Sequence, residues 1–251
     1  MRCWPAWIAR CTGAGVEIST FGDSLSMAAG LIGSGDARLA GIVGLSLAVS
    51  LTATLVACVV GMPFGALLAV GRFRGRRSLI VLFNAFMGLP PVVVGLFVYL
   101  LLSRAGPLGS FGLLFTPTAM VMAQAVLVTP IVAALSRQVI EDAWSEYREL
   151  LRSLGTGRVR AARTLLWDSR FTLTTAALAG FGRAIAEVGA VMIVGGNIDG
   201  VTRVMTTTIA LETSKGDLAL ALALGAVLMG MVLAVNFAAF VIRQWALRRW
   251  G

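Results

Sequence analysis

Two charged side chains inside an otherwise apolar stretch are the first candidates for chemistry in this sequence. Arg183 and Glu187 stand four residues apart within residues 171–197, so on a helix they share a face and can form an ion pair. Charges in an apolar segment are costly, so they usually pair with each other or serve a function. We weigh two interpretations: a structural pair that packs helices, which we favour, and direct contact between Arg183 and an anion.

Three consecutive threonines and two consecutive prolines offer weaker binding chemistry. The hydroxyls of Thr206, Thr207 and Thr208 could hydrogen-bond a tetrahedral oxyanion without holding it tightly, or these residues could simply begin a helix. Pro90 and Pro91 interrupt an apolar run. They predict either a plain helix kink or a broken helix whose freed carbonyls line a pore. All five residues are candidates for lining or gating a pore.

Most kinds of enzyme site are excluded by what the sequence lacks. There is no histidine, so imidazole bases and histidine metal sites are ruled out. The three cysteines have no ligand-like spacing, and the lone lysine, Lys215, follows no phosphate-binding glycine loop. We therefore expect no catalytic residue, no metal and no cofactor. Energy for any transport must come from a partner or from an ion gradient.

The composition predicts an all-α membrane protein. Of 251 residues, 58% are hydrophobic and only 13% are charged, whereas soluble domains have about 45–50% apolar and about 25% charged residues. The net charge of +9 would suit a nucleic-acid-binding protein, but the apolar content favours arginine-rich cytoplasmic loops of a membrane protein instead. We expect contact with lipid and none with nucleic acid.

The charges divide the chain into five predicted membrane spans, because about 20 apolar residues cross a bilayer core of roughly 30 Å. The spans lie within residues 38–72, 77–104, 104–137, 171–197 and 218–242. In the first span, Gly61, Gly65 and Ala69 have the spacing of small residues that lets helices pack closely. We assign residues 39–243 to a transmembrane domain and 244–251 to a tail.

The first 38 residues are predicted to be an extension of the transmembrane domain. Residues 1–20 resemble a signal peptide in part, and a wrongly assigned start is the other interpretation. Residues 21–32 have the weakly amphipathic pattern of a helix that lies on the membrane surface. Arginines concentrate in the 72–77 loop, the 137–170 loop and the tail. The positive-inside rule therefore places these three segments in the cytoplasm and the N-terminus outside.

The long polar segment 141–170 is predicted to form a helix, a glycine turn at Gly155 and Gly157, and a second helix. Apolar residues lie on one side of each helix at spacings of three or four, and they are Tyr147, Leu150, Leu151 and Leu154, then Val159, Ala162, Leu165 and Leu166. One interpretation is a solvated loop near anionic lipid. The other is a docking element for a cytoplasmic partner, since short amphipathic helices often bind in a partner's groove.

This segment resembles the EAA signature of the permease subunits of bacterial ABC importers. The match consists of Glu149, Leu150 and Leu151, with Gly155 six residues after the glutamate and Leu165 at the later aliphatic position. It departs from the signature at its end, where Trp167-Asp168 stands in place of Leu-Pro. In that family the loop inserts into a cleft of the ATPase subunit. The resemblance therefore implies that these five residues couple the chain to an ATPase.

Three further segments extend the resemblance over residues 35–242. Residues 88–95 are similar to the family's Leu-Pro-Pro-Val segment, which favours a pore-side break at Pro90-Pro91; residues 181–190 are similar to molybdate permeases, and residues 202–217 to the tungstate-specific branch. The resemblance implies a type I permease fold in a bacterial inner membrane. It also implies a homodimeric pore, two cytoplasmic ATPase subunits and an extracytoplasmic oxyanion-binding protein.

The function predicted from the sequence is therefore the import of an oxyanion, tungstate before molybdate or sulfate. An ion-coupled secondary transporter is the alternative of another class. It would be expected to show internal repeats and a midplane acid, for which Glu187 is the lone candidate. A membrane-embedded enzyme is a third alternative, which the missing histidines and the absence of clustered intramembrane carboxylates argue against.

Overall fold

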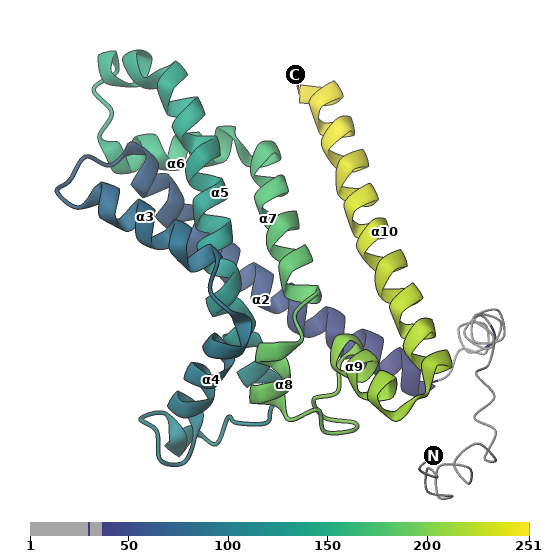
Figure 1. Cartoon of the computed structure of the whole chain (residues 1–251). Coiled ribbons are helices and arrows are strands. Elements are labelled where there is room, and N and C mark those ends of the chain that lie inside the picture. The colour runs from purple at the N-terminus through teal and green to yellow at the C-terminus, as the bar shows by residue number, and fades with distance from the viewer. Residues whose placement is uncertain (1–29, 31–36, 251) are drawn as a thin grey trace, which may run out of the picture.

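The computed structural model describes Gly30 and residues 37–250, and among these residues there are helices and no strands (Figure 1). The all-α prediction is confirmed. The predicted surface helix at 21–32 and the signal-like residues 1–20 lie outside the described residues, Gly30 excepted. The elements are α2 (Ala37–Val70), α3 (Arg76–Met87), α4 (Pro91–Leu102), η2 (Gly109–Phe111), α5 (Pro117–Ser153), α6 (Arg158–Asp168), α7 (Arg170–Ile185), α8 (Gly189–Gly195), α9 (Met205–Lys215) and α10 (Leu218–Trp250).

Three described helices are long and apolar enough to cross a membrane, namely α2, α5 and the first part of α10. Two further spans are bent pairs, in which α3 meets α4 at 101° and α7 meets α8 at 59°. Counting each pair once gives the five expected spans. The predicted span within 171–197 is one of these bent pairs: its helix stops after Ile185 and restarts at Gly189.

The break between α3 and α4 follows from the backbone chemistry of proline. The amides of Gly88 and Leu89 donate to carbonyls in the last turn of α3 and close it. Pro90 is extended, and Pro91 occupies the first turn of α4, where its missing N–H costs no hydrogen bond. The two prolines thus separate two helices rather than kink one. Their place on a pore wall stays a prediction.

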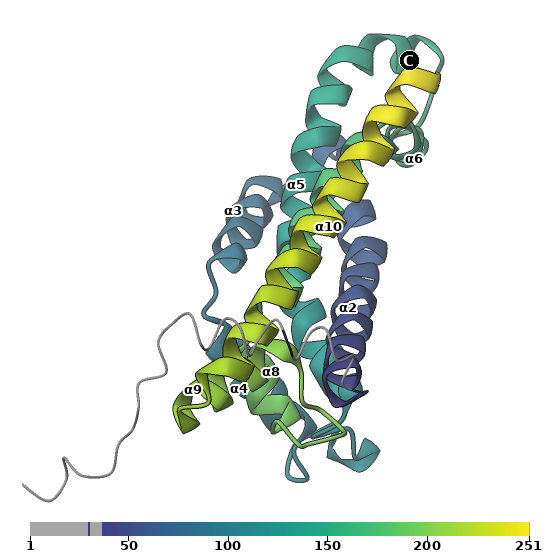
Figure 2. The ribbon, with the colours of Figure 1, turned by 90° about the vertical axis from the view of Figure 1, so that its right-hand side faces the viewer.

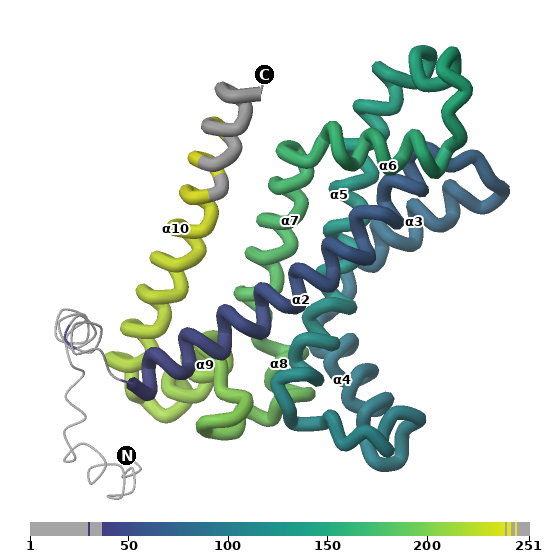
Figure 3. The backbone as a smooth tube through the Cα atoms, turned by 180° about the vertical axis from the view of Figure 1, so that it is seen from behind, coloured from purple at the N-terminus to yellow at the C-terminus, as the bar shows by residue number. Residues whose placement is uncertain are grey.

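The centre of the fold is the close packing of α2 against α5, which cross as shown from behind in Figure 3. Gly61 and Gly65 face the backbone of α5: a Cβ built on Gly61 would lie 3.1 Å from the Thr129 carbonyl oxygen, and one on Gly65 only 3.0 Å from the Arg137 nitrogen. The predicted packing role of these small residues is confirmed. Any larger side chain would hold the two helices apart.

The first part of the polar segment 141–170 is a continuation of α5 rather than a separate helix. α5 runs for 37 residues from Pro117 to Ser153, and α6 folds back beside its end. Figure 2 shows this end of α5, α6 and the C-terminal end of α10 at the same end of the molecule, while α8 and α9 lie near the other. A displacement of the α5–α6 turn can therefore reach the membrane through one continuous helix.

Candidate functional site

The turn between α5 and α6 is set by a residue in the left-handed conformation. Gly155 has a φ of +67°, which L side chains adopt only with strain. Its amide donates to the Arg152 carbonyl at 3.0 Å, and the Thr156 amide donates to the Leu151 carbonyl at 3.1 Å. These bonds satisfy carbonyls that the end of a helix leaves free. The expected helix, glycine turn and helix are thus confirmed; we call residues 141–170 the hairpin.

One face of the hairpin packs on the rest of the chain. Leu151 and Leu165 are buried in a cluster that includes Ala69 of α2 and Ile140 of α5. Val159 was predicted to share one side of the second helix with Ala162, Leu165 and Leu166, but 72% of its surface is exposed. The residues of α6 that are buried are Ala161, Ala162 and Leu165.

The other face of the hairpin presents apolar side chains to the outside. Leu150 and Leu154 are exposed by 58% and 68%, and Tyr147 is exposed beside them. Tyr147 and Leu150 also line a groove of about 210 Å³ between α5 and α6, with Leu165 in its wall. Glu149 is exposed on the same helix. The five coupling candidates therefore divide: Leu151 and Leu165 hold the hairpin, Gly155 shapes it, and Glu149 and Leu150 face outward.

The break between α7 and α8 contains the intramembrane ion pair. Arg183 Nη1 lies 2.5 Å from Glu187 Oε2, and the other carboxylate oxygen of Glu187 accepts the Ala190 amide at 3.0 Å. The Glu187 side chain is only 3% exposed. One carboxylate thus neutralises the arginine and also satisfies a free amide at the start of α8. This geometry favours the structural interpretation of the pair over direct anion contact by Arg183.

Polar side chains from α5 and α9 hold the same break, and one from α2 holds the start of α9. Gln124 of α5 donates to the Ala184 carbonyl at 3.0 Å, Thr206 of α9 donates to the Glu187 carbonyl at 2.8 Å, and Ser46 of α2 accepts the Met205 amide at 2.8 Å. Backbone groups freed by a break need such partners in a membrane. Gln124 and Ser46 were missed at the sequence level, although a polar residue within an apolar run is the signal that marks them.

The three threonines lie in the first turn of α9 and are buried. Thr207 donates to Asn197 Oδ1 at 2.9 Å, and Thr208 donates to the Val204 carbonyl at 2.7 Å. All three hydroxyl protons are thus engaged within the chain, because Thr206 donates to the Glu187 carbonyl. A role for these hydroxyls in contacting an oxyanion stays a prediction. Donating to an anion would require them to give up these hydrogen bonds, which counts against that role.

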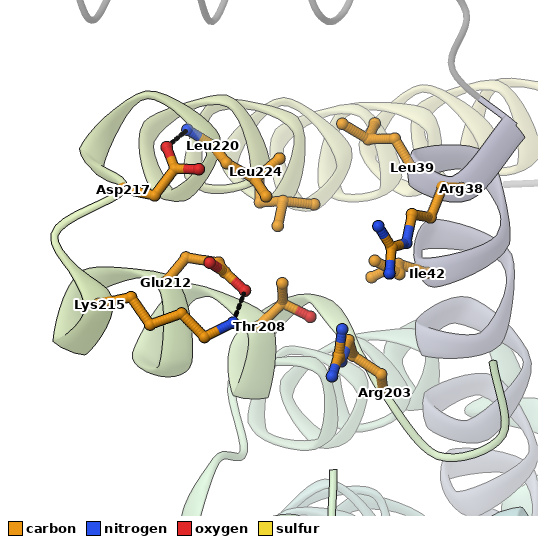
Figure 4. A pocket seen from close by; sticks show the side chains of 10 residues that line it. All are labelled: Arg38, Leu39, Ile42, Arg203, Thr208, Glu212, Lys215, Asp217, Leu220 and Leu224. Atoms are coloured by element: carbon orange, nitrogen blue, oxygen red, sulfur yellow. Dashed lines mark hydrogen bonds and ion pairs between the residues drawn. The ribbon is translucent and has the colours of Figure 1, made fainter. Parts of the chain in front are cut away.

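Charged residues gather at the opposite end of the molecule from the hairpin. They line a cavity of about 390 Å³ between α2, α9 and α10 (Figure 4). Asp199 pairs with both Arg38 and Arg203, and Lys215 pairs with Glu212 at 2.9 Å. The hydrogen bond from Arg38 lowers the pKa of Asp199. This carboxylate therefore ties α2 to the loop before α9 at neutral pH, and the tie weakens only as the pH falls towards that lowered pKa.

Comparison with known proteins agrees with an all-helical membrane protein. The family model for the binding-protein-dependent transport system inner membrane component matches residues 61–251. The chain belongs to this family. The tungstate uptake system permease protein of Peptoclostridium acidaminophilum is 41% identical to this permease over 85% of this chain and 94% of its own length.

Two other relatives span a wider range of similarity to the permease. A probable anion ABC transporter permease protein of Haloferax volcanii is 39% identical, with 79% of this chain and 88% of its own length covered. The molybdenum transport system permease protein of Escherichia coli is 29% identical, with 69% and 80% covered. The resemblance to importer permeases and the type I permease fold are confirmed. The permease is a multi-pass inner-membrane transport subunit.

Removing Arg183 should destabilise the permease more than removing the whole ion pair. Arg183→Ala leaves the Glu187 carboxylate buried without its cation, which typically costs about 3–5 kcal/mol when a buried pair is broken. We expect a smaller cost here, about 2 kcal/mol, because the arginine is 31% exposed. The double variant Arg183→Ala/Glu187→Gln should recover part of this loss. Thermal unfolding in detergent measures both, and equal destabilisation by the two variants would contradict the pairing.

Proposed function

We propose that this permease is the membrane subunit of a binding-protein-dependent ABC importer for tungstate. The observation that supports tungstate as the substrate is the difference in sequence identity to permeases for different anions. Two tungstate uptake permeases are 41% and 40% identical to this chain, whereas permeases for sulfate and molybdenum are 30% and 29% identical. Molybdate and sulfate remain the alternative substrates, because all three are tetrahedral dianions of similar shape.

In this proposal the hairpin docks into a cleft on a cytoplasmic ATPase subunit. The exposed Leu150 and Leu154 give it an apolar contact surface, and large exposed apolar side chains on a polar segment are typical of interaction sites. Two copies of the permease form the pore, and each carries one ATPase subunit. The hairpin, the 72–77 loop and the tail at 244–251 then lie in the cytoplasm, and the N-terminus lies outside.

The mechanism that follows is alternating access. ATP binding closes the two ATPase subunits on each other, and the hairpins move with them. The spans within the 39–243 domain then turn the pore from inward-open to outward-open, and an extracytoplasmic binding protein delivers the anion. The pore itself provides a path with weak contacts, since a tight site would not release its ion. Pro90, Pro91 and Thr206–Thr208 stay candidates for that path.

The rival of another class, an ion-coupled secondary transporter, needs an acid that binds and releases protons or cations in the membrane. The candidate for that acid is Glu187. Its carboxylate is already held by Arg183 and by the Ala190 amide. A group engaged on both oxygens is poorly suited to load and unload an ion, so this arrangement favours the ATP-driven importer.

Tungstate uptake into cells tests the substrate. Cells that carry the permease, its ATPase subunit and its binding protein should accumulate labelled tungstate, and cells without the permease should not. A tenfold excess of unlabelled tungstate should suppress the uptake, while the same excess of molybdate or sulfate should leave most of it. Equal suppression by molybdate, or by sulfate, would replace tungstate with that anion as the preferred substrate.

A further inference from the structure

Arg76, at the start of α3, joins three helices at the cytoplasmic end of the bundle. Its Nε donates to the Leu68 carbonyl at 2.7 Å, and one of its terminal nitrogens lies 3.4 Å from the Ala69 carbonyl. Both carbonyls belong to the last turn of α2, where the helix leaves its own carbonyls free. Arg76 therefore fixes the end of α2 to the beginning of α3.

A single carboxylate then fixes both helices to α5. Glu141 Oε1 accepts from Arg76 at 2.8 Å, and Glu141 Oε2 accepts from Arg137, one turn earlier on α5. Arg137 and Arg76 are 14% and 27% exposed, so the two cations are shielded from solvent more than the carboxylate is. Both oxygens of Glu141 are thus occupied, each by a cation from a different helix.

Glu141 also lies at the boundary between the charge-free part of α5 and its polar end. Before it lies the charge-free stretch that ends at Arg137, and after it α5 continues without a break to Ser153 and the Gly155 turn. The helix is continuous on both sides of Glu141, so the hairpin and the apolar part of α5 are joined through the residue that forms these ion pairs. Through Arg76, the end of α2 and the start of α3 are joined to the same carboxylate.

We propose that Glu141 is a positioning residue for transport: it is the joint through which movement of the hairpin is passed from α5 to α2 and α3. The inference rests on the proposed function, because it needs an ATPase that moves the hairpin. Loss of the carboxylate, at the first residue of the hairpin, would leave the Gly155 turn and the docking surface intact, since neither Leu150 nor Gly155 contacts it through any described ion pair or hydrogen bond. ATP hydrolysis would then continue, but a smaller fraction of it would be coupled to opening and closing of the pore.

The test is Glu141→Gln in the full complex of permease, ATPase subunit and binding protein, reconstituted in liposomes. The glutamine keeps the size of the side chain and removes the charge that both arginines contact. We expect the ATPase subunit to stay bound, ATP hydrolysis to persist, and the tungstate imported per ATP to fall about fivefold, the scale on which single positions change coupling. Asp142→Asn is the matched control. Asp142 is exposed and takes part in none of the described ion pairs, so this variant should import as much tungstate per ATP as the wild type.

The tungstate imported per ATP distinguishes a residue that passes on the movement of the hairpin from one that only stabilises the fold. If hydrolysis and uptake fall together in Glu141→Gln, or if the ratio stays at the wild-type value, the proposal is overturned. Should Glu141→Gln fail to assemble, Arg137→Gln removes one arm of the bridge and must show the same fall in tungstate per ATP, or the proposal is rejected. A wild-type complex that imports tungstate without hydrolysing ATP would instead overturn the proposed function.

Discussion

Gly155→Val should abolish co-purification of the permease with its cytoplasmic ATPase subunit. At a φ of +67° a β-branched residue is strained by about 1–2 kcal/mol or more. The turn can relieve that strain by leaving the left-handed conformation, which breaks the bonds that end α5 and moves Leu150 and Leu154 off the docking face. Affinity purification of the tagged permease, followed by quantification of the bound ATPase subunit, measures the effect.

The same hairpin supplies the control. Gly157 has an extended backbone, with a φ of −67°, and a Cβ there would meet no atom within 4 Å. Gly157→Val should therefore retain the ATPase subunit, and Gly155→Asn should retain part of it because asparagine tolerates the left-handed region. If folded Gly155→Val protein still bound the ATPase subunit like the wild type, the hairpin could not be the docking element in the shape described here.

Gly65→Ala should destabilise the permease far more than the same change elsewhere in α2. The added methyl would lie 3.0 Å from the Arg137 nitrogen and closer still to the Ala133 carbonyl oxygen, both on the backbone of α5. Backbone atoms cannot rotate away, so α2 and α5 must separate. Overpacking of this kind costs about 1–3 kcal/mol. The melting temperature and the yield of monodisperse protein should both fall.

Gly44→Ala makes the identical change at a site in the same helix where a Cβ meets nothing within 4 Å. Both substitutions gain the same helix propensity, about 1 kcal/mol, so their difference isolates the contact with α5. We expect Gly44→Ala to be neutral or slightly stabilising. Equal melting temperatures for the two variants would show that α2 and α5 do not approach at Gly65 as described.

The sequence predicted the parts of this fold that depend on local pattern. Charge-free runs marked α2, α5 and α10 because lipid excludes charge over a whole span. Pro90-Pro91 and Gly155 marked a break and a turn because both residue types act on their own backbone. The resemblance to importer permeases depended on the same local segments, and it was confirmed by the family comparison.

The features that the sequence did not predict depend on contacts between distant residues. The break after Ile185 contains no proline; it is held by Glu187, by Gln124 of α5 and by Thr206 of α9. The pair between Glu141 and Arg76 joins residues 65 positions apart and depends on α3 lying beside α5, whereas Arg137 stands only four residues before Glu141 on the same helix. Val159 is exposed although Ala162 and Leu165, which share its predicted side of the helix, are buried.

Transport by purified components shows whether the permease imports tungstate only with its ATP-hydrolysing partner. The permease is reconstituted in liposomes with the binding protein and labelled tungstate outside, and the ATPase subunit and ATP inside are supplied or withheld. We expect tungstate to enter only when the ATPase subunit, ATP and the binding protein are all present. Entry at an undiminished rate through the permease alone, driven by an ion gradient, would contradict it.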